Sequence, residues 1–188
     1  MTLGSAPAES TDAWRDAWPQ SKEDFERLVE VYLQRLVSYA FCRLGSIHDA
    51  EDVVQEVFVR VYARQFGRAK MKIAKTSPVG PYLYRMAANA CTDLLRKRRR
   101  SEVPLDKIAS GQKDVSALYA ATEEMRRAEG LLRRIPRKQA EVIRLRVFDD
   151  LRVNEVAEVL GCSANTVSSR LRYGFEKLRK IVSREWKQ

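Results

Sequence analysis

The sequence predicts an all-α protein made of two small helical domains joined by a flexible linker. Apolar residues recur at three- and four-residue spacing along most of the chain, which is typical of amphipathic helices, and strand-like alternation is found nowhere. Residues 101–117 are polar with little pattern, and they separate the helical segments into two groups. The chain is therefore expected to contain a mobile tail (1–21), a first domain (22–100), the linker and a second domain (118–188).

Three helices are predicted in the first domain. Their expected ranges are 22–44, 48–66 and 82–99. The second of them has apolar residues at nearly unbroken helical spacing, with a row of acidic residues beside them. Residues 67–81 have weak periodicity and two prolines, so we expect an irregular loop there. In the tail, Trp14 and Trp18 are four residues apart and could form one apolar turn, but a frayed tail is the interpretation we favour.

The third predicted helix has a basic face. It ends in five consecutive cations, Arg96 to Arg100. A basic helix end complements the helix dipole, but a run of this length exceeds that need, and a phosphate backbone is the partner that fits it. The side chains that recur at helical spacing on its polar side are Arg85, Asn89, Thr92, Arg96 and Arg99. We expect this face, together with Arg98, to bind nucleic acid.

The second domain is predicted to end in two helices joined by a tight turn. Its earlier helices are expected over residues 118–134 and from Pro136 to near Asp149. Gly161 interrupts the apolar pattern, and glycine is the residue that adopts a left-handed turn conformation at the lowest energetic cost. Ser163 is placed to cap the following helix. The predicted inner face of that helix is Ala164, Val167, Leu171 and Phe175. This arrangement is typical of a helix-turn-helix, whose second helix enters the major groove of DNA.

The outer face of the last helix favours DNA binding over an ordinary helical hairpin. It carries short hydrogen-bonding side chains and arginines, with no acidic residue before Glu176. The residues predicted to contact DNA are Asn165, Thr166, Ser168, Ser169, Arg170 and Arg172. A formal net charge of +10 and a pI near 9.7 agree with a polyanionic partner.

The composition disfavours several other kinds of site. Three widely spaced cysteines and a single histidine predict no zinc site and no disulfide framework, and the cysteines are expected to be buried thiols. No clustered carboxylates or nucleophile–base pairs occur, so we expect no catalysis, no cofactor, no metal and no small-molecule substrate. Without a signal peptide or a bilayer-length apolar run, the chain is expected to stay in the cytoplasm and not to insert into a membrane.

Three segments, in this order, resemble those of bacterial extracytoplasmic-function (group IV) sigma factors of the sigma-70 family. DAEDVVQEVFVRVY (residues 49–62) resembles the region 2 helix that docks on the β′ clamp of RNA polymerase. YLYRMAANACTDLLRKRRR (82–100) resembles the region 2 segment that melts and reads the −10 promoter element. IPRKQAEVIRLRVFDDLRVNEVAEVLGCSANTVSSRLRYGFEKLRK (135–180) resembles region 4, whose recognition helix reads the −35 element. The resemblance implies a dissociable initiation subunit whose partners are core RNA polymerase, at the β′ clamp and the β flap, and promoter DNA.

The resemblance also implies roles for individual residues. Asn89 matches a family position that contacts the −10 element, and Tyr82 stands where the family usually has Trp. Tyr82 could stack near a displaced base or pack in the core, and the sequence leaves both open. The residues expected to face polymerase are Asp49, Asp52, Gln55, Glu56 and Arg60. The acidic groups among them suit an arginine-rich docking partner. Most members of the class are held inactive by an anti-sigma factor, which is a further expected partner.

Two segments depart from the family pattern. Residues 67–81 lack the common Phe-Arg-Gly pattern, so a pocket for a flipped −10 base is not assigned there. The run Asp149-Asp150-Leu151-Arg152 stands where a Gly and a capping Ser or Thr are common, at about 1 kcal/mol of lost capping.

Two other functions compete with this interpretation. A helix-turn-helix repressor or activator predicts specific operator binding by the free protein, whereas a sigma factor predicts tight binding only together with polymerase. A general nucleic-acid chaperone accounts for the basic charge but not for the Gly161 turn and the capped helix that follows it.

Overall fold

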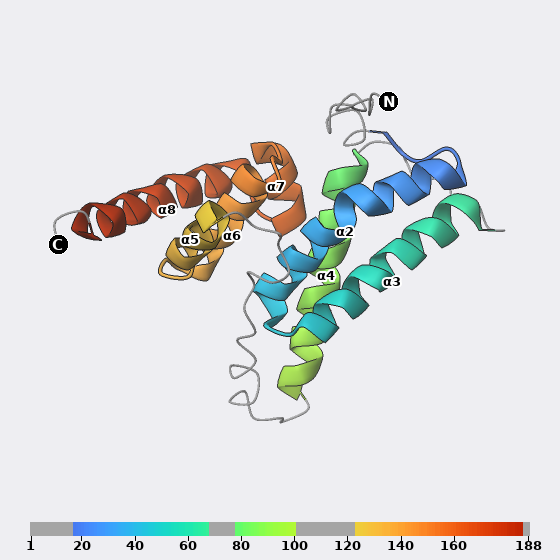
Figure 1. Cartoon of the computed structure of the whole chain (residues 1–188), viewed down its shortest axis with the longest axis horizontal. Coiled ribbons are helices and arrows are strands. Elements are labelled where there is room, and N and C mark those ends of the chain that lie inside the picture. Colours follow the sequence, from blue (N-terminus) through green and yellow to red (C-terminus); the bar gives the residue numbers. More distant parts are fainter. Residues whose placement is uncertain (1–16, 68–77, 101–122, 186–188) are drawn as a thin grey trace, which may run out of the picture.

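The computed structural model describes residues 17–67, 78–100 and 123–185, with side chains described for 17–67, 78–100 and 127–184. Every regular element in these ranges is a helix, so the all-α prediction is confirmed for this part of the chain. Figure 1 shows two groups of helices, α2–α4 and α5–α8, that lie against each other. The predicted linker lies outside the described residues.

The first group consists of α2 (Lys22–Leu44), α3 (Ile47–Phe66) and α4 (Val79–Arg100), which pack on one another. Serine side chains set the starts of the first two. Ser21 accepts a hydrogen bond from the Asp24 amide at 3.1 Å, and Ser46 caps α3 in the same way. Gly45 ends α2 in the left-handed region with φ of 72°.

The start of α4 differs from the prediction. The loop was expected to run to residue 81, but the helix begins at Val79 and includes Pro81 in its first turn. Proline is compatible with that position because the first amides of a helix need no intrahelical acceptor. The predicted loop residues 68–77 lie outside the described residues.

The N-terminal segment also differs where it is described. Trp18 is only 7% exposed, and its ring meets the Tyr82 ring edge-on with centroids 5.0 Å apart. The Pro19 carbonyl accepts a hydrogen bond from the Gln65 side chain at 2.7 Å. The frayed-tail interpretation is therefore wrong for Trp18, because its ring is buried against Tyr82 of α4. Trp14 lies outside the described residues.

The second group consists of α5 (Glu123–Leu132), α6 (Arg137–Ile143), the π-helix η3 (Arg144–Phe148), α7 (Val153–Leu160) and α8 (Ala164–Glu185). The helix expected from Pro136 to near Asp149 is thus α6 continued by η3. Before α7, Asp150 takes a left-handed conformation with φ of 53°, a region of backbone space that favours glycine. The Arg152 amide donates to the Glu155 carboxylate at 2.5 Å, so α7 begins without a capping side chain at Arg152 itself.

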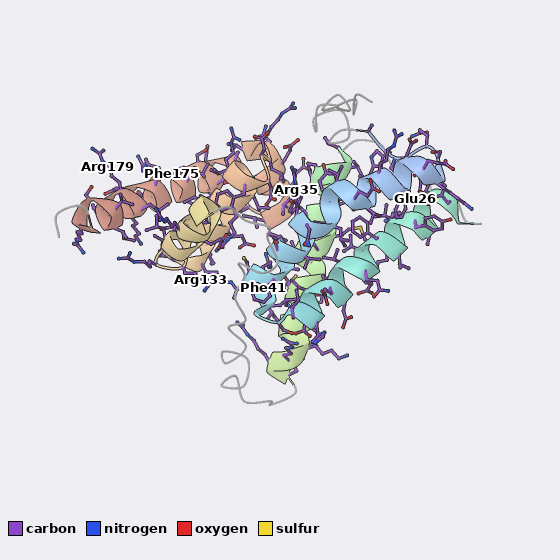
Figure 2. The ribbon with its side chains drawn as sticks, viewed as in Figure 1. Glu26, Arg35, Phe41, Arg133, Phe175 and Arg179 are labelled. Carbon is purple, nitrogen blue, oxygen red and sulfur yellow. The ribbon has the colours of Figure 1, made fainter. Side chains whose placement is uncertain are left out.

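The helix-turn-helix has the predicted turn and cap. Gly161 has φ of 59°, and Ser163 Oγ accepts from the Thr166 amide at 3.1 Å. Val167 is fully buried, as expected, but Phe175 is 48% exposed on the long helix α8 (Figure 2). The prediction of Phe175 as an inner residue is therefore wrong. Gly174 occupies that inward position, because a Cβ added there would lie 2.7 Å from Ile143 Cδ1.

Two glycines with equally open surroundings give a test of this turn. Neither Gly161 nor Gly130 has an atom within 4 Å of an added Cβ, but only Gly161 has a positive φ. Gly161→Ala is expected to lower the free energy of unfolding by about 1–2 kcal/mol through backbone strain. Gly130→Ala, within α5, is expected to raise it by up to about 1 kcal/mol through helix propensity. Urea denaturation of both variants measures the difference, and a shift of the same sign in both would contradict it.

Candidate nucleic-acid and partner interfaces

The last helix presents four of its six predicted DNA-binding residues to solvent. The exposed residues are Asn165, Ser168, Ser169 and Arg172. The Arg172 guanidinium lies 4.8 Å from the centroid of the Tyr173 ring and donates to its hydroxyl at 3.1 Å. Tyr173, which is 48% exposed, was not singled out in the sequence. Its exposure beside Arg172 adds an aromatic surface to this face.

The other two predicted residues of this helix are engaged at the turn. Thr166 is half-buried, and its hydroxyl contacts the Ser163 hydroxyl at 2.9 Å. Arg170 is also half-buried, with Nη1 3.8 Å from Cys162 Sγ. Both side chains therefore stabilise the turn in this state of the protein, in addition to any contact with DNA.

The basic face of α4 is only partly exposed. Its exposed predicted residues are Arg85, Asn89, Arg96 and Arg99. Tyr82 is 8% exposed, packs on Trp18 and accepts a hydrogen bond from Arg64 at 2.9 Å. The core-packing alternative therefore describes Tyr82 in this structure. Its ring also has the Arg85 guanidinium 5.6 Å from the centroid.

Thr92 turns toward α2 instead of toward solvent. Its hydroxyl accepts from Arg43 Nη2 at 3.0 Å and donates to the Ala88 carbonyl at 2.8 Å. Because its only proton is donated to Ala88, the Thr92 hydroxyl has no donor left to present beside Asn89.

An open groove of about 410 Å³ separates α3 from α4. Its polar lining comes from both helices: Asp49, Asp52, Glu56, Arg60, Asn89, Asp93 and Lys97. Most of the predicted polymerase-binding residues thus lie opposite the predicted −10 reader, Asn89. Glu56 and Arg60 form an exposed ion pair one helical turn apart at 2.5 Å. The carboxylates of Asp49, Asp52 and Glu56 on α3 would repel a phosphate backbone. DNA bound here would therefore have to lie toward α4.

Arg98 has its own carboxylate partner. Arg98 Nη2 lies 2.5 Å from Asp49 Oδ1, and their side chains are 27% and 22% exposed. Partial burial raises the pKa of Asp49, but hydrogen bonds from Ser46 and Arg98 outweigh this and hold that pKa below its ordinary value. A residue predicted to bind DNA and one predicted to bind polymerase therefore neutralise each other.

A second groove, on the other side of α3, was not predicted. It has a volume of about 650 Å³ between α2 and α3 and a mostly apolar lining. Leu33, Val59 and Tyr62 in its lining are 43%, 60% and 38% exposed. Gln55, a predicted polymerase contact, lies at this groove and not at the α3/α4 groove. Exposed large apolar side chains gathered in one hollow are typical of a protein docking site.

Within the described ranges, no group of three or more His, Cys, Asp and Glu side chains is placed to hold a metal ion. All three cysteines are free thiols; Cys91 is buried, and Cys42 and Cys162 are half-buried. No helix among the described residues has the length and apolar character required to cross a bilayer.

Comparison with known proteins identifies both groups of helices. Residues 28–101 match sigma-70 region 2, and residues 131–180 match sigma-70 region 4. The chain is 27% identical over 173 residues to the extracytoplasmic-function RNA polymerase sigma factor SigW of Bacillus subtilis, covering 85% of this chain and 89% of that protein. It is 30% identical over 157 residues to the RNA polymerase sigma-E factor of Streptomyces avermitilis, covering 84% of each.

The fold has solved counterparts. A co-crystal structure of the sigma factor RpoE with the anti-sigma factor NepR from Bartonella quintana matches with a TM-score of 0.59 and 21% identity, covering 86% of this chain and 98% of that chain. At this identity the likeness concerns the fold alone. The two matched regions divide this fold in the same way: region 2 contains the basic helix α4, and region 4 contains the helix-turn-helix. The chain belongs to the sigma-70 family and is an alternative RNA polymerase sigma factor of the extracytoplasmic-function class.

Proposed function

We propose that this sigma factor binds core RNA polymerase through region 2 and directs promoter-specific initiation by reading the −35 element with α8 and the −10 element with α4. The observation that carries the proposal is the pair of exposed polar faces on α8 and α4, each in a separate matched region. Nucleotide chemistry then belongs to the polymerase, and the sigma factor contributes binding and strand opening.

For the upstream contact, Asn165 and Ser168 are the exposed polar side chains nearest the N-terminal end of α8, the end that reaches base edges in helix-turn-helix proteins. Arg172, one turn further along, has the reach for a base or a phosphate, and the Tyr173 ring restrains its guanidinium. The major groove, about 12 Å wide, accommodates such a helix.

For the downstream contact, Asn89 is the proposed base reader, and the exposed arginines Arg85, Arg96 and Arg99 follow the backbone. Holding a base out of the stack costs a few kcal/mol, which the phosphate contacts must offset. Because Tyr82 is packed on Trp18, we assign it a supporting role for α4 and not a stacking role.

For polymerase, we propose docking of the β′ clamp on α3, where Asp52 and Glu56 supply negative charge and Gln55 leads to the apolar α2/α3 groove. The β flap is the proposed partner of region 4. A protein with these partners acts in the bacterial cytoplasm. The solved RpoE relative is in complex with an anti-sigma factor, and we propose that an anti-sigma factor also controls this chain.

Transcription with purified core polymerase and a genomic promoter library tests the function. We expect promoter-specific transcripts only when the sigma factor is added, and no specific transcript from any promoter would contradict the proposal. Gel shifts with and without core enzyme test the competing repressor or activator function, which requires tight operator binding by the free protein.

The two neighbouring cations Arg98 and Arg99 are expected to differ. Arg99 is exposed, so Arg99→Ala is expected to reduce the slope of log K against log salt by about 0.7–0.9, the loss of one phosphate contact. Arg98→Ala is expected to change that slope less, since Asp49 already pairs with Arg98. Promoter binding by the holoenzyme across a salt series measures both slopes. Equal reductions would show that the Arg98–Asp49 pair breaks on DNA.

A further inference from the structure

We propose that Trp18 is a positioning residue for the DNA-binding face of α4: it holds the Tyr82 ring, and Tyr82 in turn holds the Arg85 guanidinium in place for a DNA phosphate. Trp18 lies before the segment that matches region 2, residues 28–101, so the match assigns it no role. This role rests on the function proposed above, in which Arg85 contacts the −10 element.

The segment that carries Trp18 is anchored to the two helices beside it. The Pro19 carbonyl accepts a hydrogen bond from Gln65 Nε2, near the end of α3, at 2.7 Å. The Gln20 amide donates to Asp24 Oδ2, in the first turn of α2, at 3.0 Å, and Gln20 Nε2 donates to the Trp18 carbonyl at 2.7 Å. Figure 1 shows this segment running from the start of α4 to the start of α2. The backbone next to the buried indole is therefore held at a defined place.

Trp18 supports the start of α4 from outside the three-helix group. Its ring meets the Tyr82 ring edge-on, with 65° between the ring planes, and the Tyr82 hydroxyl accepts a hydrogen bond from Arg64 Nη1 at 2.9 Å. Two residues earlier, an added Cβ on Gly80 would lie 2.4 Å from the Tyr32 hydroxyl oxygen of α2. Residues two apart in an α-helix point about 200° apart. The first turns of α4 are thus packed on α2 at Gly80 and on Trp18 at the opposite side.

Tyr82 connects Trp18 to the exposed face of α4. Arg85 lies one helical turn further on, and its guanidinium is 5.6 Å from the centroid of the Tyr82 ring, within the about 6 Å at which an aromatic face attracts a cation. Arg85 and Asn89 are both exposed, and their four-residue spacing places them on one side of the helix. The Arg85 guanidinium is therefore held beside the proposed base reader.

This arrangement lets an uncharged residue contribute to an electrostatic contact that it does not itself make. A guanidinium held against a ring before binding loses less side-chain entropy when it meets a phosphate. Without the indole, the Tyr82 ring can tilt into the space that is left beside it, and the Arg85 guanidinium then loses its support. Trp18 thus acts on DNA through Tyr82 and Arg85.

Promoter binding by the holoenzyme across a salt series tests this role. We expect Trp18→Ala to reduce the slope of log K against log salt by about 0.7–0.9, the loss of one phosphate contact, although it removes no charge. Arg85→Ala should give the same reduction, and the double variant should give no more than either change alone, because both remove the same contact. Trp18→Phe keeps an aromatic ring at this place and should keep the wild-type slope.

Val54→Ala is the control for a general loss of stability. Val54 is fully buried in α3, about 15 Å along that helix from Arg64, so its truncation should lower the stability of region 2 and leave the slope unchanged. Circular dichroism establishes that each variant keeps its helices. Trp18→Leu serves if Trp18→Ala unfolds, since leucine is too small to fill the place of the indole and should reduce the slope in the same direction.

An unchanged slope in Trp18→Ala would overturn the positioning role, even with a loss of affinity, because a base contact or plain core packing by Trp18 predicts that result. Additive reductions in the double variant would overturn the connection through Arg85. An unchanged slope in Arg85→Ala would remove the phosphate contact itself. All three results leave the proposed function intact if the wild type gives promoter-specific transcripts, whereas a lack of such transcripts would contradict that function and the role of Trp18 with it.

Discussion

Replacing Glu129 by alanine is expected to lower the free energy of unfolding of region 4 by about 3–5 kcal/mol. Glu129 is 7% exposed and accepts two hydrogen bonds from Arg144, Nε to Oε1 at 2.8 Å and Nη2 to Oε2 at 2.7 Å. The pair connects α5 to η3, which leads into the helix-turn-helix. Truncation removes a bidentate carboxylate from a guanidinium that is only 13% exposed, and the loss of these two charge-assisted hydrogen bonds is the main source of the effect.

The loss should affect the upstream contact first. Region 4 has a small core, so a change of this size unfolds much of the population of this region and weakens protection of the −35 element. Urea denaturation measures the stability, and nuclease footprinting of the holoenzyme measures the protection. Glu176→Ala is the control, because its ion pair with Lys180 at 2.9 Å is exposed and is worth at most about 0.5 kcal/mol. Similar losses from both variants would show that the buried pair adds nothing beyond a surface pair.

Features set by neighbouring residues could be predicted from the sequence. The Ser163 cap and the Gly161 turn depend on backbone groups within three residues, so the residue types alone indicate them. The bounds of α2 follow for the same reason from its apolar spacing and the glycine after it. Gly174 shows the limit of this reasoning: periodicity favoured Phe175, but the inward position is Gly174, where a Cβ would lie 2.7 Å from Ile143 Cδ1.

Features that join distant residues could not be predicted. The Arg98–Asp49 pair and the Tyr84–Asp149 hydrogen bond depend on how helices pack, and no local pattern reports that Thr92 turns toward Arg43. The predicted site residues were taken as free to meet a partner, whereas several already have one within the chain. Sequence similarity supplied the family, but it did not show which members of each face are available.

Replacing Val59 by aspartate is expected to weaken binding to core polymerase on the order of 100-fold, about 2.8 kcal/mol. Val59 is 60% exposed in the apolar α2/α3 groove, so the change leaves the core of region 2 intact. If the clamp covers this groove, the new carboxylate must lose its water without an assigned cation to pair with, which opposes docking. Fluorescence anisotropy of labelled sigma factor titrated with core enzyme measures the affinity.

Val59→Ile is the matched control, because it keeps an apolar side chain at the same place and should bind within about threefold of the wild type, less than 0.7 kcal/mol. Glu56→Gln tests the other groove, where a charge on the α3/α4 side is removed. Normal binding by Val59→Asp together with weak binding by Glu56→Gln would confine polymerase to the α3/α4 side. Weak binding by Val59→Asp together with normal binding by Glu56→Gln would place the main contact at the apolar α2/α3 groove. The acidic residues of α3 would then serve to keep DNA toward α4. The two variants thus decide which groove beside α3 polymerase uses, because Val59 lines the α2/α3 groove and Glu56 lines the α3/α4 groove.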